Sequence, residues 1–148
     1  MLYELVSRAV ELTRGSSTRL LVNDRFDVAR AAGADGVHLT SSSLPPQVVR
    51  EACGSRFLLG ASTHSLEEAR NARDKGADFV VFGPVFETES KRAYGPPQGL
   101  ARLQQVTSEL QGFPVLAIGG VTLDNAESCL AAGASGFAGI SWFNAPNR

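Results

Sequence analysis

Short, largely apolar runs recur along the chain and alternate with longer stretches in which apolar residues return at helical spacing. The runs that predict strands are 19–22, 36–39, 57–61, 79–82, 115–118 and 136–140. The stretches that predict helices are 2–13, 27–32, 46–53, 65–75, 99–110 and 123–132. Continuous apolar runs are typical of parallel strands that are covered on both faces. We therefore expect repeated strand–helix units around a parallel sheet.

A five-residue pattern marks the passage from helix to strand at three places. Its copies are Ala-Gly-Ala-Asp-Gly at 32–36, Lys-Gly-Ala-Asp-Phe at 75–79 and Ala-Gly-Ala-Ser-Gly at 132–136. Glycine directly after a helical stretch favours a left-handed helix end. The three copies therefore predict the same helix-to-strand joint, used three times.

Strict alternation in units of about twenty residues, with no long GxGxxG turn, favours a barrel over an open doubly wound sheet. The predicted fold class is α/β, of the (β/α)8 TIM-barrel type, in a single domain over 1–148. Only six strands can be assigned where such a barrel has eight. Either the barrel is incomplete and lacks its first two strands, or the chain forms a compact open α/β sheet.

The composition of the chain argues against some classes of binding partner. The chain has 148 residues, 43% of them hydrophobic and 20% charged, with a formal net charge of −1. No basic run favours a nucleic acid or an anionic membrane, and no apolar stretch reaches the ~20 residues of a membrane span. Cys53 and Cys129 lie inside helical patterns without metal-ligand spacing and are expected to be buried. We expect a cytoplasmic protein that binds small molecules.

Small polar residues follow nearly every predicted strand, where parallel α/β folds bind their ligands. Gly119 and Gly120, together with Ser141 after the last strand, would admit a phosphate close to backbone amides. A tight strand-to-helix turn would also explain the two glycines. Thr88, Ser90 and Lys91 offer two hydroxyls and a cation to a phosphate or diphosphate, although such a loop is also ordinary surface.

Other strand exits leave two interpretations open. Asp24 could hold Mg²⁺ or could cap the next helix. His64 stands at the start of a predicted helix, where it could cap the helix or act in catalysis. His38 lies within a predicted strand and is expected to be a packed residue. The hydroxyl run Thr-Ser-Ser-Ser at 40–43 follows a strand and could be a binding site or a turn.

Several motifs in fixed order resemble the thiamine phosphate synthases and their paralogues, the thiazole tautomerases. They are NDRFDVARAAGADGVHL, GASTHSLEEARNARDKGADFVVFGPVF, the Thr-x-Ser-Lys of 88–91, PVLAIGGVT and AAGASGFAGIS. The resemblance runs from Leu21 to Ser141. It implies a (β/α)8 barrel enzyme of thiamine biosynthesis, a transferase that joins hydroxymethylpyrimidine diphosphate to thiazole phosphate and releases diphosphate with Mg²⁺.

The resemblance also implies roles for individual residues. Ser62 and Lys91 would be catalytic, and Asp24 would bind Mg²⁺. The substrates would be held by Asn23, Ser62, Thr88, Ser90, Lys91, Gly119, Gly120, Ile140 and Ser141. Lys91 and Mg²⁺ would neutralise the charge that grows on the leaving diphosphate.

The chain departs from these relatives at three points. Ser43 stands where the synthases have the aspartate that is their second metal ligand, and Pro84 stands where the tautomerases have a catalytic histidine. The family's first two strands, which help to grip diphosphate, are expected upstream of Met1. A thiazole tautomerase-like or non-catalytic phosphate-binding paralogue is therefore the alternative function. An open barrel edge would favour a homo-oligomer.

Overall fold

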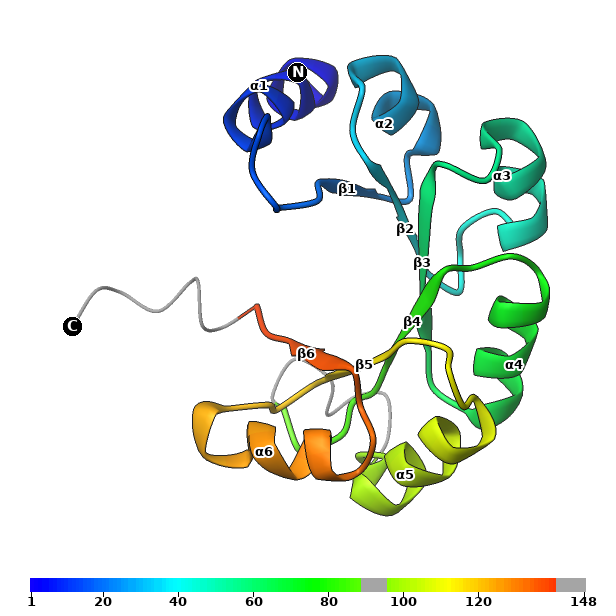
Figure 1. The fold of residues 1–148 in the computed structure, drawn as a ribbon, viewed down its shortest axis with the longest axis vertical. Helices are drawn as coiled ribbons and strands as arrows, with labels where there is room; N and C mark the ends of the chain where they lie inside the picture. The colour runs from blue at the N-terminus through cyan, green and yellow to red at the C-terminus, as the bar shows by residue number, and fades with distance from the viewer. Residues whose placement is uncertain (89–95, 141–148) are drawn as a thin grey trace. The chain divides into compact units, whose positions relative to one another are not determined.

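A computed structural model describes residues 1–88 and 96–140, in which helices and strands alternate as expected (Figure 1). The order is α1 (Leu2–Thr13), β1 (Leu21–Asn23), α2 (Phe26–Ala32), β2 (Gly36–Leu39), α3 (Pro46–Cys53), β3 (Leu58–Thr63), α4 (Leu66–Asp74), β4 (Phe79–Phe82), α5 (Gly99–Glu109), β5 (Val115–Ile118), α6 (Leu123–Ala131) and β6 (Gly136–Ala138). Each predicted element in this part of the chain is confirmed. The boundaries move by one or two residues, and β3 includes Ser62 and Thr63, which were expected in a loop.

The chain divides into two compact units. Unit 1 contains Met1–Ser62 and Ala72–Asp78, and unit 2 contains Thr63–Asn71 and the chain from Phe79 onward. In unit 1, β2 pairs in parallel with β1 on one side and with β3 on the other. In unit 2, β5 pairs in parallel with β4 and with β6. Both units are therefore parallel α/β structures, as the continuous apolar runs predicted.

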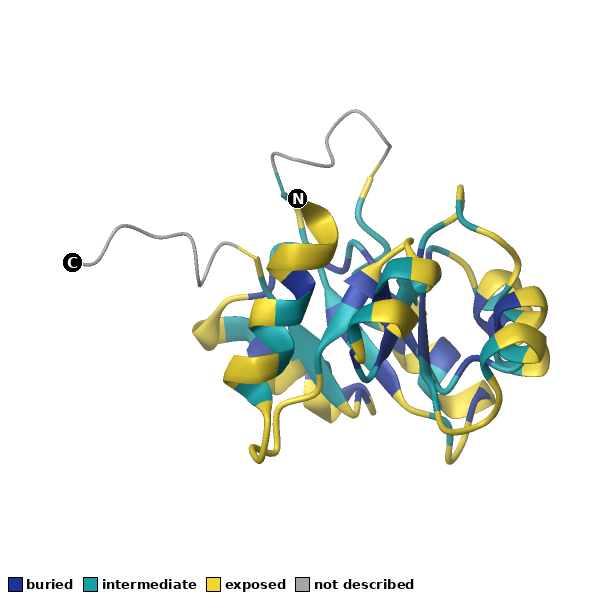
Figure 2. Cartoon of the chain, turned by 90° about the horizontal axis from the view of Figure 1, so that it is seen from above, coloured by how far each residue is buried: buried dark blue, intermediate teal, exposed yellow. Residues whose placement is uncertain are grey.

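Two clusters of buried side chains hold unit 1 together. Val6 of α1, Val22 of β1 and Ala29 of α2 form one cluster. The other contains Val37, Leu39, Val49 and Leu59, from β2, α3 and β3. Alternate residues of β2 and β3 thus face the helices, and the residues between them face the opposite way. Figure 2 shows the same pattern, with buried residues concentrated on the strands and on the helix faces turned toward them.

The three predicted joints have the same backbone geometry. Gly33, Gly76 and Gly133 have φ of 75°, 92° and 89°. At each joint the glycine N–H donates to the carbonyl three residues back, and the next alanine N–H donates to the carbonyl five residues back. These two bonds define the Schellman helix end, which needs a left-handed residue. The repeated Gly-Ala pattern is therefore explained by helix termination.

The residue after each Gly-Ala pair ties its joint to the preceding strand. The N–H groups of Asp35, Asp78 and Ser135 donate to the carbonyls of Leu20, Leu59 and Val115. The two aspartates also accept with Oδ2, from the N–H of Leu20 at 2.8 Å and of Leu59 at 2.7 Å. The aspartates at these joints therefore have a structural role.

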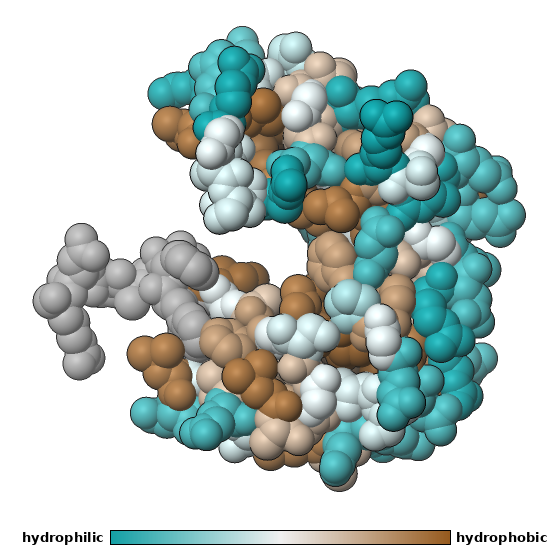
Figure 3. Space-filling view, viewed as in Figure 1, coloured by the Kyte–Doolittle hydropathy of each residue, from teal (hydrophilic) through white to brown (hydrophobic). Residues whose placement is uncertain are grey.

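Helix α1 carries apolar side chains on two faces. Val6 and Val10 pack toward α2, whereas Leu2, Leu5 and Leu12 are 41%, 65% and 86% exposed. Hydrophobic side chains accordingly reach the surface over α1 (Figure 3). Within the described residues, no helix is both long enough and apolar enough to span a bilayer.

The cysteines are both unpaired. Cys129 is fully buried in α6, as expected, whereas Cys53 at the end of α3 is only half-buried. Cys53 packs against the second cluster of unit 1. Both therefore act as small apolar residues of the core or its edge.

Candidate active site at the carboxyl ends of the strands

Three polar side chains of unit 1 lie on the strand face opposite to the helix-facing core. In the sheet register, Asn23 of β1 lies beside His38 of β2, and His38 lies beside Gly60 of β3. Paired residues of parallel strands project to the same face, and so do residues two apart in one strand. Asn23, His38 and Ser62 therefore share one face near the carboxyl ends of their strands. This places two predicted substrate-binding residues together.

His38 contacts Ser62 directly. Its Nε2 lies 2.8 Å from the Ser62 hydroxyl oxygen, and both side chains are partly buried. Burial lowers the pKa of the His38 imidazole, which favours the neutral ring. The expectation that His38 is only a packed strand residue is therefore incomplete. The two-residue period of β2, which places His38 opposite to Val37 and Leu39, was the signal in the sequence for its polar face.

Asp24 occupies a tight turn directly after β1. It has φ of 64°, and it is the only non-glycine residue with positive φ in the described part of the chain. The N–H of Arg25 donates to the carbonyl of Asn23 at 2.7 Å, which closes a three-residue turn around Asp24. Such γ-turns are strained, and strained residues persist where the surrounding structure holds them in place. The His38 carbonyl provides such support by accepting the Asp24 N–H at 2.8 Å.

The helix-cap interpretation of Asp24 finds no support in the hydrogen bonds around α2. Arg25 is the residue before the helix, and no side chain caps its N-terminus. Asp27 instead accepts two hydrogen bonds from the Arg25 guanidinium, at 2.8 and 2.7 Å. This pair lowers the pKa of Asp27 to about 2. Asp24 itself is exposed at the strand exit.

The hydroxyl run after β2 forms a turn. The N–H of Thr40 donates to Ser43 Oγ at 2.8 Å, and the N–H of Ser43 donates to the Thr40 carbonyl at 3.1 Å. The Thr40 hydroxyl lies 3.1 Å from the hydroxyls of both Ser42 and Ser43. The hydroxyls therefore bond largely among themselves, which is the turn interpretation of this segment.

In unit 2, two glycines pack against the segment that leads to Thr88. Gly119 and Gly120 have φ of 92° and 63°. A Cβ on Gly119 would clash with Pro84, and one on Gly120 would overlap the backbone oxygen of Glu87. The turn and the close packing each require glycine here. The prediction that Gly119 and Gly120 form a tight strand-to-helix turn is therefore confirmed. Phosphate binding at these residues stays a prediction.

The other predicted residues of unit 2 are only partly covered by the structure. Thr88 is half-buried at the end of the segment that packs on Gly120. Ile140 is 72% exposed and lies two residues after β6, as Gly120 lies two residues after β5. Ser90, Lys91 and Ser141 lie outside the described residues.

His64 takes part in the cap of α4. The Glu68 carboxylate accepts the His64 N–H at 2.7 Å and lies 3.2 Å from His64 Nδ1. The N–H of Glu68 donates to Ser65 Oγ at 3.1 Å, which caps the first turn of the helix. These bonds favour the capping interpretation of His64.

The chain resembles known proteins along most of its length. A sequence profile described as thiamine monophosphate synthase matches residues 1–143. The chain belongs to this family. The resemblance drawn from the motifs of the sequence is thereby confirmed.

Individual members of the thiamine monophosphate synthase family support the assignment. The thiamine-phosphate synthase of Chlorobium phaeovibrioides is 47% identical over 130 residues, which are 88% of this chain and 62% of that protein. That of Methanoculleus marisnigri is 45% identical over 141 residues, which are 93% of this chain and 66% of that protein. The chain thus spans about two thirds of the length of these relatives.

A solved structure of the family confirms the fold class. The thiamine phosphate pyrophosphorylase from Pyrococcus furiosus matches 95% of this chain and 66% of its own chain, with a TM-score of 0.83 and 40% identity. The chain therefore has the α/β fold of the (β/α)-barrel type that its sequence predicts, with six parallel strands in the described residues.

The residues present do not fit a magnesium centre built by the protein alone. The described residues contain no group of three histidine, cysteine, aspartate or glutamate side chains that could hold a metal ion. Ser43, at the position of the family's second ligand, uses its hydroxyl within the turn. Asp24 then provides one carboxylate ligand after β1. One carboxylate suits magnesium only when substrate phosphates supply further ligands.

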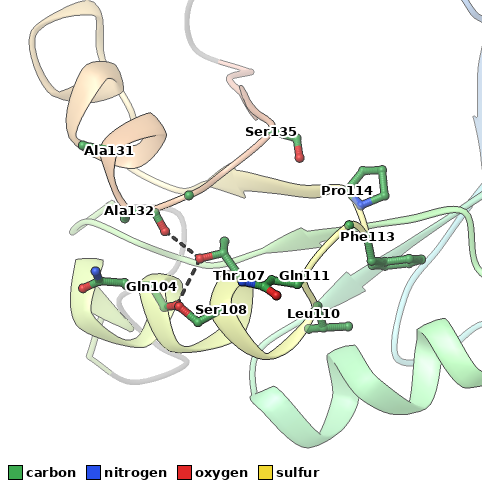
Figure 4. A pocket seen from close by; sticks show the side chains of 12 residues that line it. Gln104, Thr107, Ser108, Leu110, Gln111, Phe113, Pro114, Ala131, Ala132 and Ser135 are labelled. Atoms are coloured by element: carbon green, nitrogen blue, oxygen red, sulfur yellow. Dashed lines mark hydrogen bonds between the residues drawn. The ribbon is translucent and has the colours of Figure 1, made fainter.

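A cavity of unit 2 lies at the amino ends of β5 and β6, whereas Gly119 and Gly120 follow the carboxyl end of β5 (Figure 4). It has a volume of about 460 Å³, and Pro114 and Ser135, which precede β5 and β6, help to line it. Thr107 of α5 spans one side, donating to the carbonyls of Ala132 at 2.6 Å and Gln104 at 3.0 Å. None of the described residues that line it is charged. The cavity is therefore a groove between α5 and α6 rather than part of the candidate site.

Proposed function

We propose that the chain acts as a thiamine-phosphate synthase, a transferase that joins hydroxymethylpyrimidine diphosphate to thiazole phosphate and releases diphosphate. The observation that carries this proposal is the common face of Asn23 and Ser62, directly beside the strained turn at Asp24. Family membership supports it, since the named relatives are thiamine-phosphate synthases. A cytoplasmic location is part of the proposal, and two unpaired cysteines fit a reducing compartment.

In this proposal the two substrates are bound by different residues. The Asn23 amide and the Ser62 hydroxyl donate hydrogen bonds to oxygens of the pyrimidine diphosphate. Thr88, Ser90, Gly119, Gly120, Ile140 and Ser141 hold the thiazole phosphate. In the reaction, the carbon–nitrogen bond between the thiazole nitrogen and the pyrimidine methylene carbon forms as the carbon–oxygen bond to diphosphate breaks, and binding both reactants to one protein favours this step. Lys91 stabilises the negative charge that develops on the diphosphate.

We propose that magnesium binds to the protein together with the diphosphate of the substrate. An ion that arrives on the diphosphate would neutralise part of its charge, and Asp24 would add one carboxylate to it. Calorimetry can test this arrangement. Mg²⁺ alone should not bind measurably, whereas Mg²⁺ with inorganic diphosphate should bind, and more weakly to Asp24→Asn than to the wild type. Tight binding of Mg²⁺ alone would contradict it.

The coupling reaction itself tests the function. The purified chain would be incubated with both substrates and Mg²⁺, and thiamine phosphate and released diphosphate would be measured. Ser62→Ala should lose most of the activity, whereas Ser135→Ala, which removes an exposed hydroxyl at the opposite strand end, should keep it. A wild-type chain that binds thiazole phosphate but forms no product would be a binding paralogue, and the proposed function would be wrong.

A further inference from the structure

His38 of β2 lies between Asn23 of β1 and the strand of Ser62 in the sheet register, and the family resemblance gives it no role. It lies beside Asn23 in the sheet register and touches Ser62 through Nε2. Its other neighbour in the register is Gly60, which has no side chain, so the imidazole has room to reach along β3 to Ser62. Its backbone carbonyl accepts the N–H of Asp24. One residue thus contacts both strand exits.

The direction of the hydrogen bond between His38 and Ser62 decides what Ser62 can offer to an anion. A serine hydroxyl has a single proton. If Ser62 donates that proton to Nε2, only its lone pairs remain for a phosphoryl oxygen, and they repel it. If Nε2 carries a proton and donates it to Ser62 Oγ, the serine proton is available to the anion. Only the second arrangement suits a diphosphate ligand.

We propose that His38 is a positioning residue that donates its Nε2 proton to Ser62 Oγ and so directs the Ser62 hydroxyl proton toward a diphosphate oxygen. This inference rests on the proposed function, because it assigns the ligand of Ser62. The same contact fixes the serine rotamer before the ligand arrives, which lowers the entropy lost on binding. His38 itself need not touch the diphosphate.

Calorimetry with inorganic diphosphate and Mg²⁺ tests the proposal on the full chain. Ser62→Ala should weaken binding about tenfold, because it removes one charge-assisted hydrogen bond to the diphosphate. His38→Phe keeps a ring but has no donor, and it should also weaken binding, by no more than Ser62→Ala does, because the Ser62 hydroxyl is no longer held in the orientation that suits the anion. His38→Gln retains an N–H donor and should keep most of the affinity. In the Ser62→Ala background, His38→Phe should have no further effect, since its role acts through the serine. Thermal unfolding of each variant checks that it is folded.

The ring tautomer gives a readout that does not depend on the ligand. Nitrogen-15 spectra of the free protein should show the proton of His38 on Nε2. A proton on Nδ1 with Nε2 as the acceptor would overturn the proposal, and so would unchanged diphosphate binding by His38→Phe or additive losses in the double variant. If the wild-type chain binds no diphosphate, the proposed function fails together with this inference. Normal binding that is indifferent to His38 would remove the inference alone.

Discussion

Thr63, the last residue of β3, buries a hydroxyl that has no hydrogen-bond partner in the described part of the chain. The residue is 2% exposed and, by the two-residue period of the strand, faces away from Ser62. An unsatisfied buried polar group costs about 1–3 kcal/mol. Thr63→Val keeps the shape and removes the hydroxyl, so it should raise the free energy of unfolding by about 1 kcal/mol in urea denaturation.

Thr63→Ser is the matched control, because it keeps the hydroxyl and loses the methyl group. It should be less stable than the wild type. A loss of stability in Thr63→Val would mean that the hydroxyl is satisfied in solution and that its burial is not a defect of the fold.

Asp24 combines strain with a proposed role in binding. Positive φ costs an L-residue about 1–2 kcal/mol, whereas glycine adopts it freely. Asp24→Gly should therefore be more stable than Asp24→Ala by about 1 kcal/mol, a comparison in which both variants lack the carboxylate. Both should bind diphosphate with Mg²⁺ more weakly than the wild type. Equal stability of the two variants would show that the turn is not strained in solution.

At the scale of elements, Arg50 connects α3 to the loop before β3 and to the joint before β4. Its guanidinium donates to the carbonyls of Gly54, Phe57 and Gly76 and to Asp78 Oδ2, all at 2.7 to 2.9 Å. Lysine cannot reproduce this fork of donors. Arg50→Lys should lower the free energy of unfolding by about 2 kcal/mol. The exposed Arg56 gives the control, since Arg56→Lys should change it by less than about 0.5 kcal/mol.

The helix-to-strand joint at Asp35 predicts a dependence of stability on pH. The hydrogen bond from the Leu20 N–H, assisted by Arg19, lowers the pKa of Asp35 below its ordinary value of 3.8. A lowered carboxyl pKa gives stability that is complete above the ordinary value and is lost as the pH falls through the folded-state value. Thermal unfolding between pH 5 and pH 2.5 measures it.

Asp35→Asn should lower the melting temperature at pH 5 and should flatten its fall toward low pH. Glu11→Gln, at an exposed carboxylate of α1, should leave the pH profile as it is in the wild type. The same slope in Asp35→Asn and in the wild type would show that other carboxylates dominate the acid response.

Across the whole molecule, local patterns predicted the elements well because the signals lie in neighbouring residues. The Gly-Ala pairs after α2, α4 and α6 predicted three helix ends with one geometry, and the structure shows the Schellman bonds at each. The end of β3 was missed because Ser62 and Thr63 are polar, although the strand continues through them. Polar residues at a strand end resemble a loop in sequence.

The candidate site was less predictable, because its contacts join residues far apart in the chain. The motifs named Asn23, Asp24 and Ser62, yet the contact between His38 and Ser62 depends on the register of β2 and β3. The turn of the 40–43 hydroxyls could not be told from a binding site until their mutual hydrogen bonds were known.

The central claim is that phosphorylated ligands bind at the carboxyl ends of the strands. Amide chemical shifts recorded while inorganic diphosphate with Mg²⁺ and then thiazole phosphate are added would test it most directly. Diphosphate should move the signals of Asn23 and Ser62, and thiazole phosphate should move that of Gly120. The signals of Gln111 and Ser135, which line the cavity between α5 and α6, should not shift. Shifts confined to the cavity residues, or no shifts at saturating ligand, would contradict the claim.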